Sequence, residues 1–149
     1  MADIQFYHLT STTLERALPK LLEKSLKAGF TSVVTAASSE QAEALSAHLW
    51  QYDPATFLPH GTEADGNAER QPVFLTAGDA NPAAADLLVV TDGRSVTPET
   101  AYKRILDIFD GTDDTALSAA RGRWKTYAAD GHTVAYIKQS ESGAWEKQG

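Results

Sequence analysis

The sequence predicts one α/β domain with a mainly parallel sheet and helices on both faces of that sheet. Strand-like runs alternate with amphipathic helix-like segments over the first third of the chain, and this order is typical of parallel sheets covered by helices. Several runs, such as residues 87–91 (LLVVT), are apolar almost throughout, as strands buried on both faces are. A length of 149 residues suits a single domain of this kind, Rossmann-like in topology.

The predicted strands are short and rich in β-branched, aromatic or leucine side chains. They lie at residues 3–9, 31–36, 72–76, 87–91, 104–109 and 133–139. A long, turn-rich connection at residues 51–71 and a short helix beginning at Thr97 separate some of them. The last strand is a candidate edge of the sheet, and residues 140–149 form a polar tail with Trp145 as its large apolar anchor. Without an internal repeat or linker, residues 1–149 form one domain.

The predicted helices carry start and stop signals in the sequence. Residues 11–13 offer N-caps for a leucine-rich helix that ends near Gly29. Pro19 lies within this pattern, so we expect the helix to become regular only from that residue. A capping box at residues 38–41 begins a second helix, which extends to about residue 50.

Composition and charge exclude several classes of protein. No apolar run approaches the length needed to cross a bilayer, and the start, MADIQFYHL, lacks the basic region and cleavage site of a signal peptide, so we expect a cytoplasmic protein. The absence of cysteine excludes disulfides, thiolate metal sites and cysteine nucleophiles. A formal net charge of −7 argues against nucleic acid as the direct ligand.

The turns after the first two strands lack the motifs of nucleotide-binding proteins. Open α/β sheets bind ligands beyond the carboxyl ends of their strands, which here means residues 10–12 and 37–39. Neither turn contains G-x-G-x-x-G or G-x-x-x-x-G-K-[ST], and without those glycines a backbone cradle for phosphate is difficult to form. The alternative interpretation, a small α/β enzyme or nucleotide-binding protein, would use the strand ends near Ser11, Ser38 and Asp92.

Candidate catalytic and metal-binding residues are scattered. The histidines form no H-x-x-x-H or H-E-x-x-H pair; they are His8, His48, His60 and His132. Asp-Gly pairs at residues 92–93 and 110–111 follow predicted strands, but Asp-Gly is a strong turn dipeptide, so we favour turns over catalytic carboxylates. No G-x-S-x-G elbow is present. We therefore predict no cofactor, no metal ion and no enzymatic activity.

Residues 113–131 (DDTALSAARGRWKTYAADG) are predicted to form a helix with a basic and aromatic face. The two aspartates suit its start and the glycine suits its end. A spacing of four, three and four residues places on one face Leu117, Arg121, Trp124 and Ala128. Arg123 and Lys125 are assigned to the same or adjacent rows of the helix. Together with Arg121 they are the three cations of residues 115–127, a stretch that contains no acid.

This face has the chemistry needed to bind an acidic ligand. Arg121 and Lys125 lie one helical turn apart, so their charged ends can reach the same ligand. A guanidinium can hold a carboxylate by two parallel hydrogen bonds, an ammonium acts as a point charge, and Trp124 offers a flat apolar wall. The competing interpretation, which the sequence leaves open, is that Trp124 anchors the core and the cations form an ordinary solvated face.

A second aromatic stretch lies around the long connection. Trp50 and Phe57 flank a loop, and the usual behaviour of large aromatic side chains favours the interpretation that they anchor this loop on the sheet. The alternative is an exposed apolar patch that binds a protein partner.

Four segments in order carry a family resemblance: FYHLT, LW, FLPHG and RGRWKTYAADGH. Their combination resembles the chi subunit of bacterial DNA polymerase III over nearly the whole chain. The resemblance implies a non-catalytic accessory subunit of the clamp-loader complex. Members of that family bind the acidic, phenylalanine-ended C-terminal tail of single-stranded DNA-binding protein, and they bind the psi subunit, which connects them to the clamp loader.

The resemblance also implies roles for particular residues. The tail-binding helix of the family falls on residues 114–129, and its basic and aromatic positions are Arg121, Trp124 and Lys125. Leu117 stands where family members have a lysine, which removes one cation. Phe57 matches a position of psi contact, and Trp50 matches a partner-facing tryptophan. Direct binding of single-stranded DNA by the same helix is a third hypothesis, against which the net charge argues.

Overall fold

Eight strands in the described part of the chain form one sheet in the computed structural model. The structure describes residues 3–51, 60–62, 72–77, 85–93, 102–140, 142 and 145–147, without the side chains of residues 50 and 51. The strands are β1 (Asp3–Leu9), β2 (Ser32–Thr35), β3 (Gly61–Thr62), β4 (Val73–Thr76), β5 (Leu87–Val90), β6 (Arg104–Asp110), β7 (Thr133–Gln139) and β8 (Trp145–Lys147). Their order is β3-β4-β2-β5-β6-β1-β7-β8, and all neighbours pair in parallel except β7 and β8. The mainly parallel sheet is confirmed.

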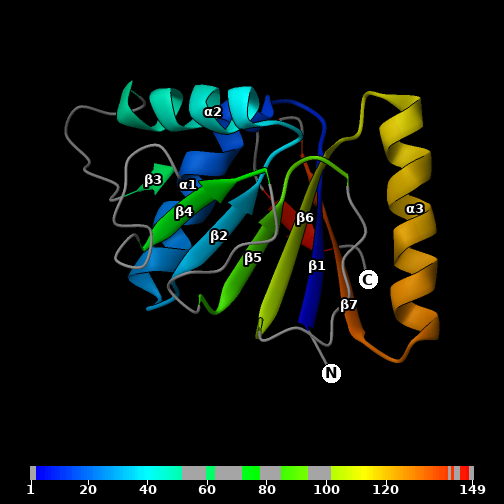
Figure 1. The fold of residues 1–149 in the computed structure, drawn as a ribbon. Coiled ribbons are helices and arrows are strands. Elements are labelled where there is room, and N and C mark those ends of the chain that lie inside the picture. Colours follow the sequence, from blue (N-terminus) through cyan, green and yellow to red (C-terminus); the bar gives the residue numbers. More distant parts are fainter. Residues whose placement is uncertain are drawn as a thin grey trace.

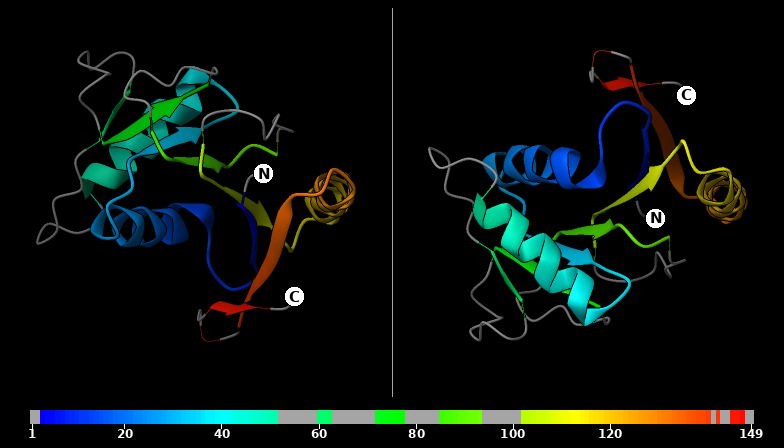
Figure 2. Two further views of the ribbon diagram at one scale, coloured as in Figure 1. Left: turned by 90° about the horizontal axis from the view of Figure 1, so that it is seen from below. Right: turned by 90° about the horizontal axis from the view of Figure 1, so that it is seen from above.

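The helices cover both faces of this sheet, as predicted. They are α1 (Leu14–Lys27), α2 (Ser39–Gln51) and α3 (Asp114–Ala129). Figures 1 and 2 show α1 and α2 together on one face and α3 by itself on the other. Because α3 connects the parallel strands β6 and β7, it runs antiparallel to them, and its N-terminus lies at the edge where the strands end. No helix among the described residues is long and apolar enough to cross a membrane.

Strand alternation divides the interior into two apolar cores, since successive side chains point to opposite faces of the sheet. The core on the side of α1 and α2 includes Leu18, Leu22, Val34 and Val89. The core beneath α3 includes Ile4, Phe6, Ala120 and Tyr127. Helix α3 therefore packs on a core of its own, and that packing decides which of its side chains face solvent.

Helix α1 is continuous from its first residue, so the prediction that it becomes regular only at Pro19 is wrong. It starts directly after the N-cap Thr13, whose carbonyl oxygen accepts a hydrogen bond from the N–H of Ala17 at 3.0 Å. Pro19 lies inside the helix, where its missing N–H removes one main-chain hydrogen bond, and its ring is buried. Gly29 follows the helix with a φ of 91°, in agreement with the predicted stop.

Two short strands lie outside the sequence prediction. Strand β3 falls within the connection at residues 51–71 and pairs with β4. Strand β8 pairs with β7, so β7 is not the edge strand that the sequence suggested, and residues 145–147 belong to the sheet and not to a polar tail. Trp145 contacts Tyr7 edge-to-face, with ring centroids 5.1 Å apart. The helix predicted to begin at Thr97 lies outside the described residues.

Candidate functional site

Helix α3 begins and ends where the sequence indicated. The Asp113 carboxylate accepts hydrogen bonds from the backbone N–H groups of Thr115 at 2.9 Å and Ala116 at 3.4 Å, and thereby caps the first turn. After the helix, Gly131 has a φ of 86°, a conformation that costs glycine little. These two ends set the length of α3, and the packing of Ala120 and Tyr127 on the core beneath it sets its rotation on the sheet.

That rotation places the predicted site residues at or near the surface. Arg121 and Lys125 are exposed, one turn apart on the side of α3 that faces solvent. Leu117 and Trp124 are half-buried at the boundary between helix and sheet. Both are packed against the core beneath α3. The structure therefore brings Arg121, Trp124 and Lys125 onto one stretch of α3.

Arg123 does not belong to the basic face, which corrects the sequence assignment. Its side chain is 6% exposed, and its Nε and Nη2 donate to the two carboxylate oxygens of Asp107 at 2.7 and 2.9 Å. Nη1 donates to the carbonyl oxygen of Gly93 at 3.0 Å. Burial raises the pKa of Asp107, and the charge and hydrogen bonds of Arg123 oppose that rise. Arg123 thus joins α3 to β6 and to the turn after β5.

Trp124 combines both roles that the sequence left open. Its ring centroid lies 5.7 Å from that of Phe6 and 5.8 Å from that of Tyr136, so the indole anchors α3 on β1 and β7. The same side chain is only half-buried, so part of it remains available to a ligand. Aromatic side chains of this kind contribute both packing and an apolar contact surface.

Two further residues lie beside this aromatic contact, His8 and Lys138, and the sequence did not indicate a role for either of them. His8 of β1 is 7% exposed, and its Nδ1 forms a hydrogen bond with the hydroxyl of Tyr136. Burial lowers the pKa of His8, and the charges of Lys138 and Arg121 lower it further, so the imidazole is neutral at pH 7. Lys138 therefore lies on the same side of the sheet as Arg121. Alternation along residues 133–139 places Lys138 on the same face as Tyr136, but its position near Arg121 follows only from the packing of β7 against α3.

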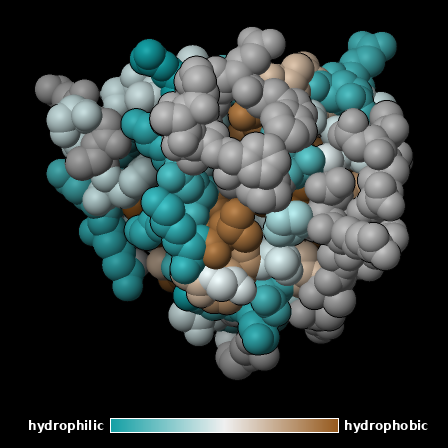
Figure 3. All heavy atoms as spheres, turned by 90° about the vertical axis from the view of Figure 1, so that its left-hand side faces the viewer, coloured by the Kyte–Doolittle hydropathy of each residue, from teal (hydrophilic) through white to brown (hydrophobic). Residues whose placement is uncertain are grey.

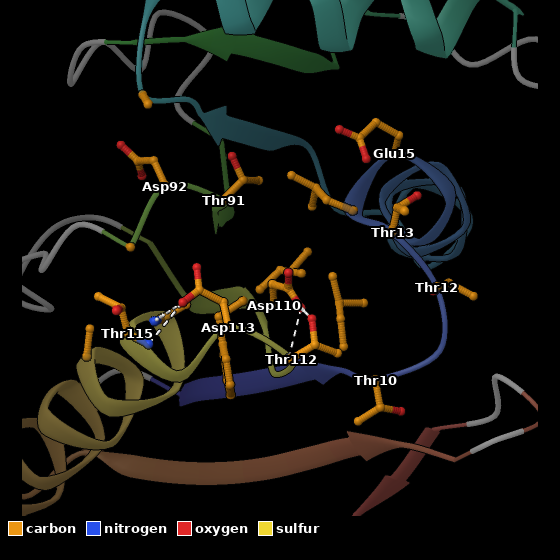
Figure 4. A pocket seen from close by; sticks show the side chains of 18 of the residues that line it. Thr10, Thr12, Thr13, Glu15, Thr91, Asp92, Asp110, Thr112, Asp113 and Thr115 are labelled. Carbon is orange, nitrogen blue, oxygen red and sulfur yellow. Dashed lines mark hydrogen bonds between the residues drawn. The ribbon is translucent and has the colours of Figure 1, made fainter.

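The loops at the carboxyl edge of the sheet enclose a separate pocket of about 850 Å³. Figure 4 shows around it Thr10, Thr12 and Thr13 after β1, Thr91 and Asp92 after β5, Asp110 at the end of β6, and Thr112 and Asp113 after that strand. This is where the alternative interpretation places a small-molecule site. Ser11 and Asp92 line the pocket, whereas the Ser38 hydroxyl accepts a hydrogen bond from the N–H of Gln41 at 3.1 Å within the predicted capping box.

The phosphate-binding position of this edge is already filled from within the chain. Backbone N–H groups of residues 10, 11 and 12 converge on Oε1 of Gln139, at 3.2, 3.1 and 3.1 Å. Nε2 of Gln139 in turn donates to Oγ1 of Thr12 at 2.8 Å. Three successive N–H groups of this kind form the concavity that binds anions in nucleotide-binding proteins. Here an amide oxygen of the protein occupies it.

The charges around the pocket also oppose an anionic ligand. Four carboxylates line it, from Glu15, Asp92, Asp110 and Asp113. Of its two arginines, Arg16 is exposed on α1 and Arg123 is paired with Asp107. The described residues contain no group of three or more His, Asp or Glu side chains that could hold a metal ion. Among the described lining residues, the carboxylates therefore outnumber the cations that a phosphate or nucleotide would need.

The Asp-Gly pair at residues 110–111 leads into a turn, and Asp92 lies in a bend. Gly93 has a φ of 74°. The Asp110 carboxylate accepts hydrogen bonds from Oγ1 and the N–H of Thr112 at 2.6 and 2.9 Å, and these bonds lower its pKa. Gly111 lies so close to β1 that an added Cβ would approach Nε2 of His8 to 1.8 Å. The geometry agrees with the turn interpretation of both pairs.

The second predicted surface lies mostly outside the described residues. Trp50 is in α2, but its side chain is not described, and Phe57 lies in an undescribed range. Figure 3 faces the α2 and β3 side of the molecule, where a small group of apolar atoms lies beside a ridge of polar ones. The partner-contact roles of Trp50 and Phe57 stay predictions.

Fold and site together define an α/β domain in which α3 presents two exposed cations beside aromatic side chains. The chain belongs to the family described as DNA polymerase III chi subunit, HolC, whose family model matches residues 1–135. The resemblance seen in the sequence is thereby confirmed.

Two relatives carry the same family name. The probable DNA polymerase III subunit chi of Rickettsia prowazekii is 28% identical over 109 residues, which cover 73% of this chain and 66% of that protein. The DNA polymerase III subunit chi of Haemophilus influenzae is 28% identical over 131 residues, covering 85% of this chain and 90% of that protein. The chain thus spans just under two thirds of the first relative and nearly all of the second.

Solved structures of the same fold come from a different kind of protein. The C-terminal domain of Dbp5 from S. cerevisiae, bound to Gle1 and IP6, has a TM-score of 0.59 at 10% identity over 91% of this chain and 90% of that one. A Dbp5 chain bound to Nup159, Gle1, IP6 and ADP has a TM-score of 0.60 at 10% identity over 92% of this chain and 42% of that one. At this identity the likeness shows the fold alone.

Proposed function

We propose that this protein is a non-catalytic accessory subunit of DNA polymerase III that binds the acidic C-terminal tail of single-stranded DNA-binding protein and links it to the clamp loader. The observation that carries the proposal is the exposure of Arg121 and Lys125, one turn apart, beside the half-buried indole of Trp124. Membership of the chi family supports the replicative setting. We further infer a cytoplasmic location.

Each side chain of the site matches a part of such a tail. The guanidinium of Arg121 can hold a carboxylate by two hydrogen bonds, while Lys125 attracts a second carboxylate as a point charge. The apolar surface of Trp124 and Leu117 can receive a phenylalanine ring. Because both cations are exposed, their attraction is screened by salt, and binding should weaken as ionic strength rises.

The connection to the clamp loader rests on the family resemblance. In that hypothesis Trp50 and Phe57 contact the psi subunit or another clamp-loader subunit. Neither side chain is described in the structure, so no geometry supports this part of the proposal. A pull-down of purified clamp-loader subunits with and without Phe57→Ala tests it.

Calorimetry with a synthetic acidic peptide that ends in phenylalanine tests the tail-binding function. We expect one-to-one, salt-sensitive binding that Arg121→Ala weakens about tenfold, as the loss of a charge-assisted hydrogen bond would. Arg16→Ala is the matched control, because Arg16 is also exposed but lies on the opposite face of the sheet. Equal affinities for wild type and Arg121→Ala would show that the site lies elsewhere.

The pocket at the carboxyl edge favours a second candidate function, a small α/β enzyme or nucleotide-binding protein. Its volume suits a small ligand. The filled concavity at residues 10–12 and the surrounding carboxylates argue against a phosphate group. A thermal-shift titration with ATP and Mg²⁺ separates the two functions, because a saturable rise in melting temperature would support the second.

A further inference from the structure

Lys138 on β7 is placed to face the same ligand as Arg121. Strand β7 pairs with β1 so that Lys138 lies beside His8. Val134 and Tyr136 of β7 pack into the core beneath α3, and alternation directs every second side chain to one face, so Lys138 points to the α3 side as well. Lys138 is exposed. Its ammonium group therefore lies at the surface, along the seam between α3 and β7.

The direction of α3 brings its N-terminal half to this end of β7. The helix runs antiparallel to the strand, so the end of β7 lies near the start of α3 (Figure 1). Arg121 projects from that half, and Lys125 lies one turn further from the end of β7. The charges of both Arg121 and Lys138 act on the imidazole of His8, in agreement with their common position. Tyr136 lies between the two elements, with its hydroxyl bonded to His8 and its ring against Trp124.

This arrangement places two like charges near His8, and no ion pair in the described part of the chain involves either of them. Two acids lie at this end: Glu146 of β8 is in register with Lys138, and Asp110 is hydrogen-bonded to Thr112. Two cations over an aromatic floor fit a carboxylate attached to an aromatic residue, and a C-terminal phenylalanine has both groups. Leu117 supplies no charge one turn before Arg121, so Lys138 is the cation available on that side.

We propose that Arg121 and Lys138 together bind the terminal carboxylate of the acidic tail across the seam between α3 and β7, with the terminal phenylalanine ring against Tyr136 and Trp124. Lys125 then attracts the acidic residues that precede the phenylalanine. The proposal rests on the proposed tail-binding function and adds a strand residue to it, which makes the site a product of two elements and not of α3 alone.

Calorimetry with two versions of the acidic, phenylalanine-ended peptide tests this, one with a free C-terminal carboxylate and one amidated. We expect Lys138→Ala to weaken binding of the free acid about fivefold to tenfold, and to change binding of the amide less than twofold. Amidation and Lys138→Ala should therefore be non-additive, as groups in direct contact are. The exposed Lys24 of α1 provides the control variant Lys24→Ala.

The outcomes separate this inference from the tail-binding function. If wild type binds neither peptide, the proposed function fails. If wild type binds, Arg121→Ala binds poorly and Lys138→Ala binds like wild type, the function stands and the role of Lys138 is overturned. Equal losses for both peptides would also overturn it, because Lys138 would then attract the acidic residues only. Competition by oligo(dT) at the same salt would indicate a phosphate-binding surface and contradict the carboxylate assignment.

Discussion

The backbone N–H groups of residues 10–12 and the guanidinium of Arg121 are both suited to bind an anion, but only the N–H groups have an acceptor among the described residues. Gln139 fills the first position with its own amide oxygen. Arg121 is exposed and forms no ion pair within the described residues. The same contrast recurs two residues apart on α3, since Arg123 is paired with Asp107. Donors with internal acceptors hold the fold together, and a donor without one is available for recognition.

The largest loss of stability is expected from substituting Arg123, the arginine that is paired with Asp107. Arg123→Ala would leave the Asp107 carboxylate buried without its cation, which should lower the free energy of unfolding by about 3–5 kcal/mol. Arg121→Ala is the control and should change it by less than about 0.5 kcal/mol, as exposed substitutions usually do. Urea denaturation measures both. Equal losses of stability in the two variants would contradict the difference between a paired and an exposed arginine. The double variant Arg123→Met/Asp107→Leu should recover much of the stability that Arg123→Ala loses.

A smaller loss of stability is expected from substituting Gln139, whose amide oxygen fills the concavity formed by the N–H groups of residues 10–12. Gln139→Ala would leave three backbone N–H groups without their acceptor, and we expect it to lower the free energy of unfolding by about 2–3 kcal/mol in urea denaturation. Gln139→Glu keeps an acceptor oxygen in place and should cost clearly less. If the Ala and Glu variants proved equally stable, the amide oxygen would not be what holds this turn.

The smallest loss of stability is expected at Gly111, which lies against His8 in the floor of the candidate site. In Gly111→Ala the new methyl would collide with His8 and approach the carbonyl oxygen of Leu9 to 2.8 Å, so we expect a loss of about 1–2 kcal/mol and weaker peptide binding as Tyr136 shifts. Gly122→Ala is the matched control, because nothing lies within 4 Å of its added Cβ and alanine favours a helix by about 0.5–1 kcal/mol. Peptide affinity that is unchanged in Gly111→Ala would show that this floor is not part of the site.

Local signals in the sequence predicted most of the fold. Alternation and composition located β1 and β7, and the Asp113 cap and Gly131 stop located α3, because each depends on neighbouring residues. The short strands β3 and β8 escaped prediction, since their conformation depends on pairing with β4 and β7. Pro19 misled the prediction of α1, because the loss of one main-chain hydrogen bond inside the helix does not interrupt it, and the proline ring is buried.

The candidate site was predictable only in part. Helical spacing identified Arg121, Trp124 and Lys125 as neighbours, but Arg123 lies roughly 200° around the helix from Arg121, and only the position of the sheet shows that this side is buried. The contact of Lys138 with the same region depends on the packing of β7 against α3. Pairings across the fold of this kind leave no pattern in a short stretch of sequence.

The position of β1 has a consequence for biosynthesis. This strand leaves the ribosome first, yet Asp3 pairs with Arg104 of β6 and with Thr133 of β7, so both of its neighbours are translated late. The part of the sheet around β2, β4 and β5 can assemble before β6 and β7, the two neighbours of β1, have been synthesised. Translation that stalls before residue 133 would therefore yield a chain in which Trp124 has no Tyr136 to rest against, however well the earlier part has folded.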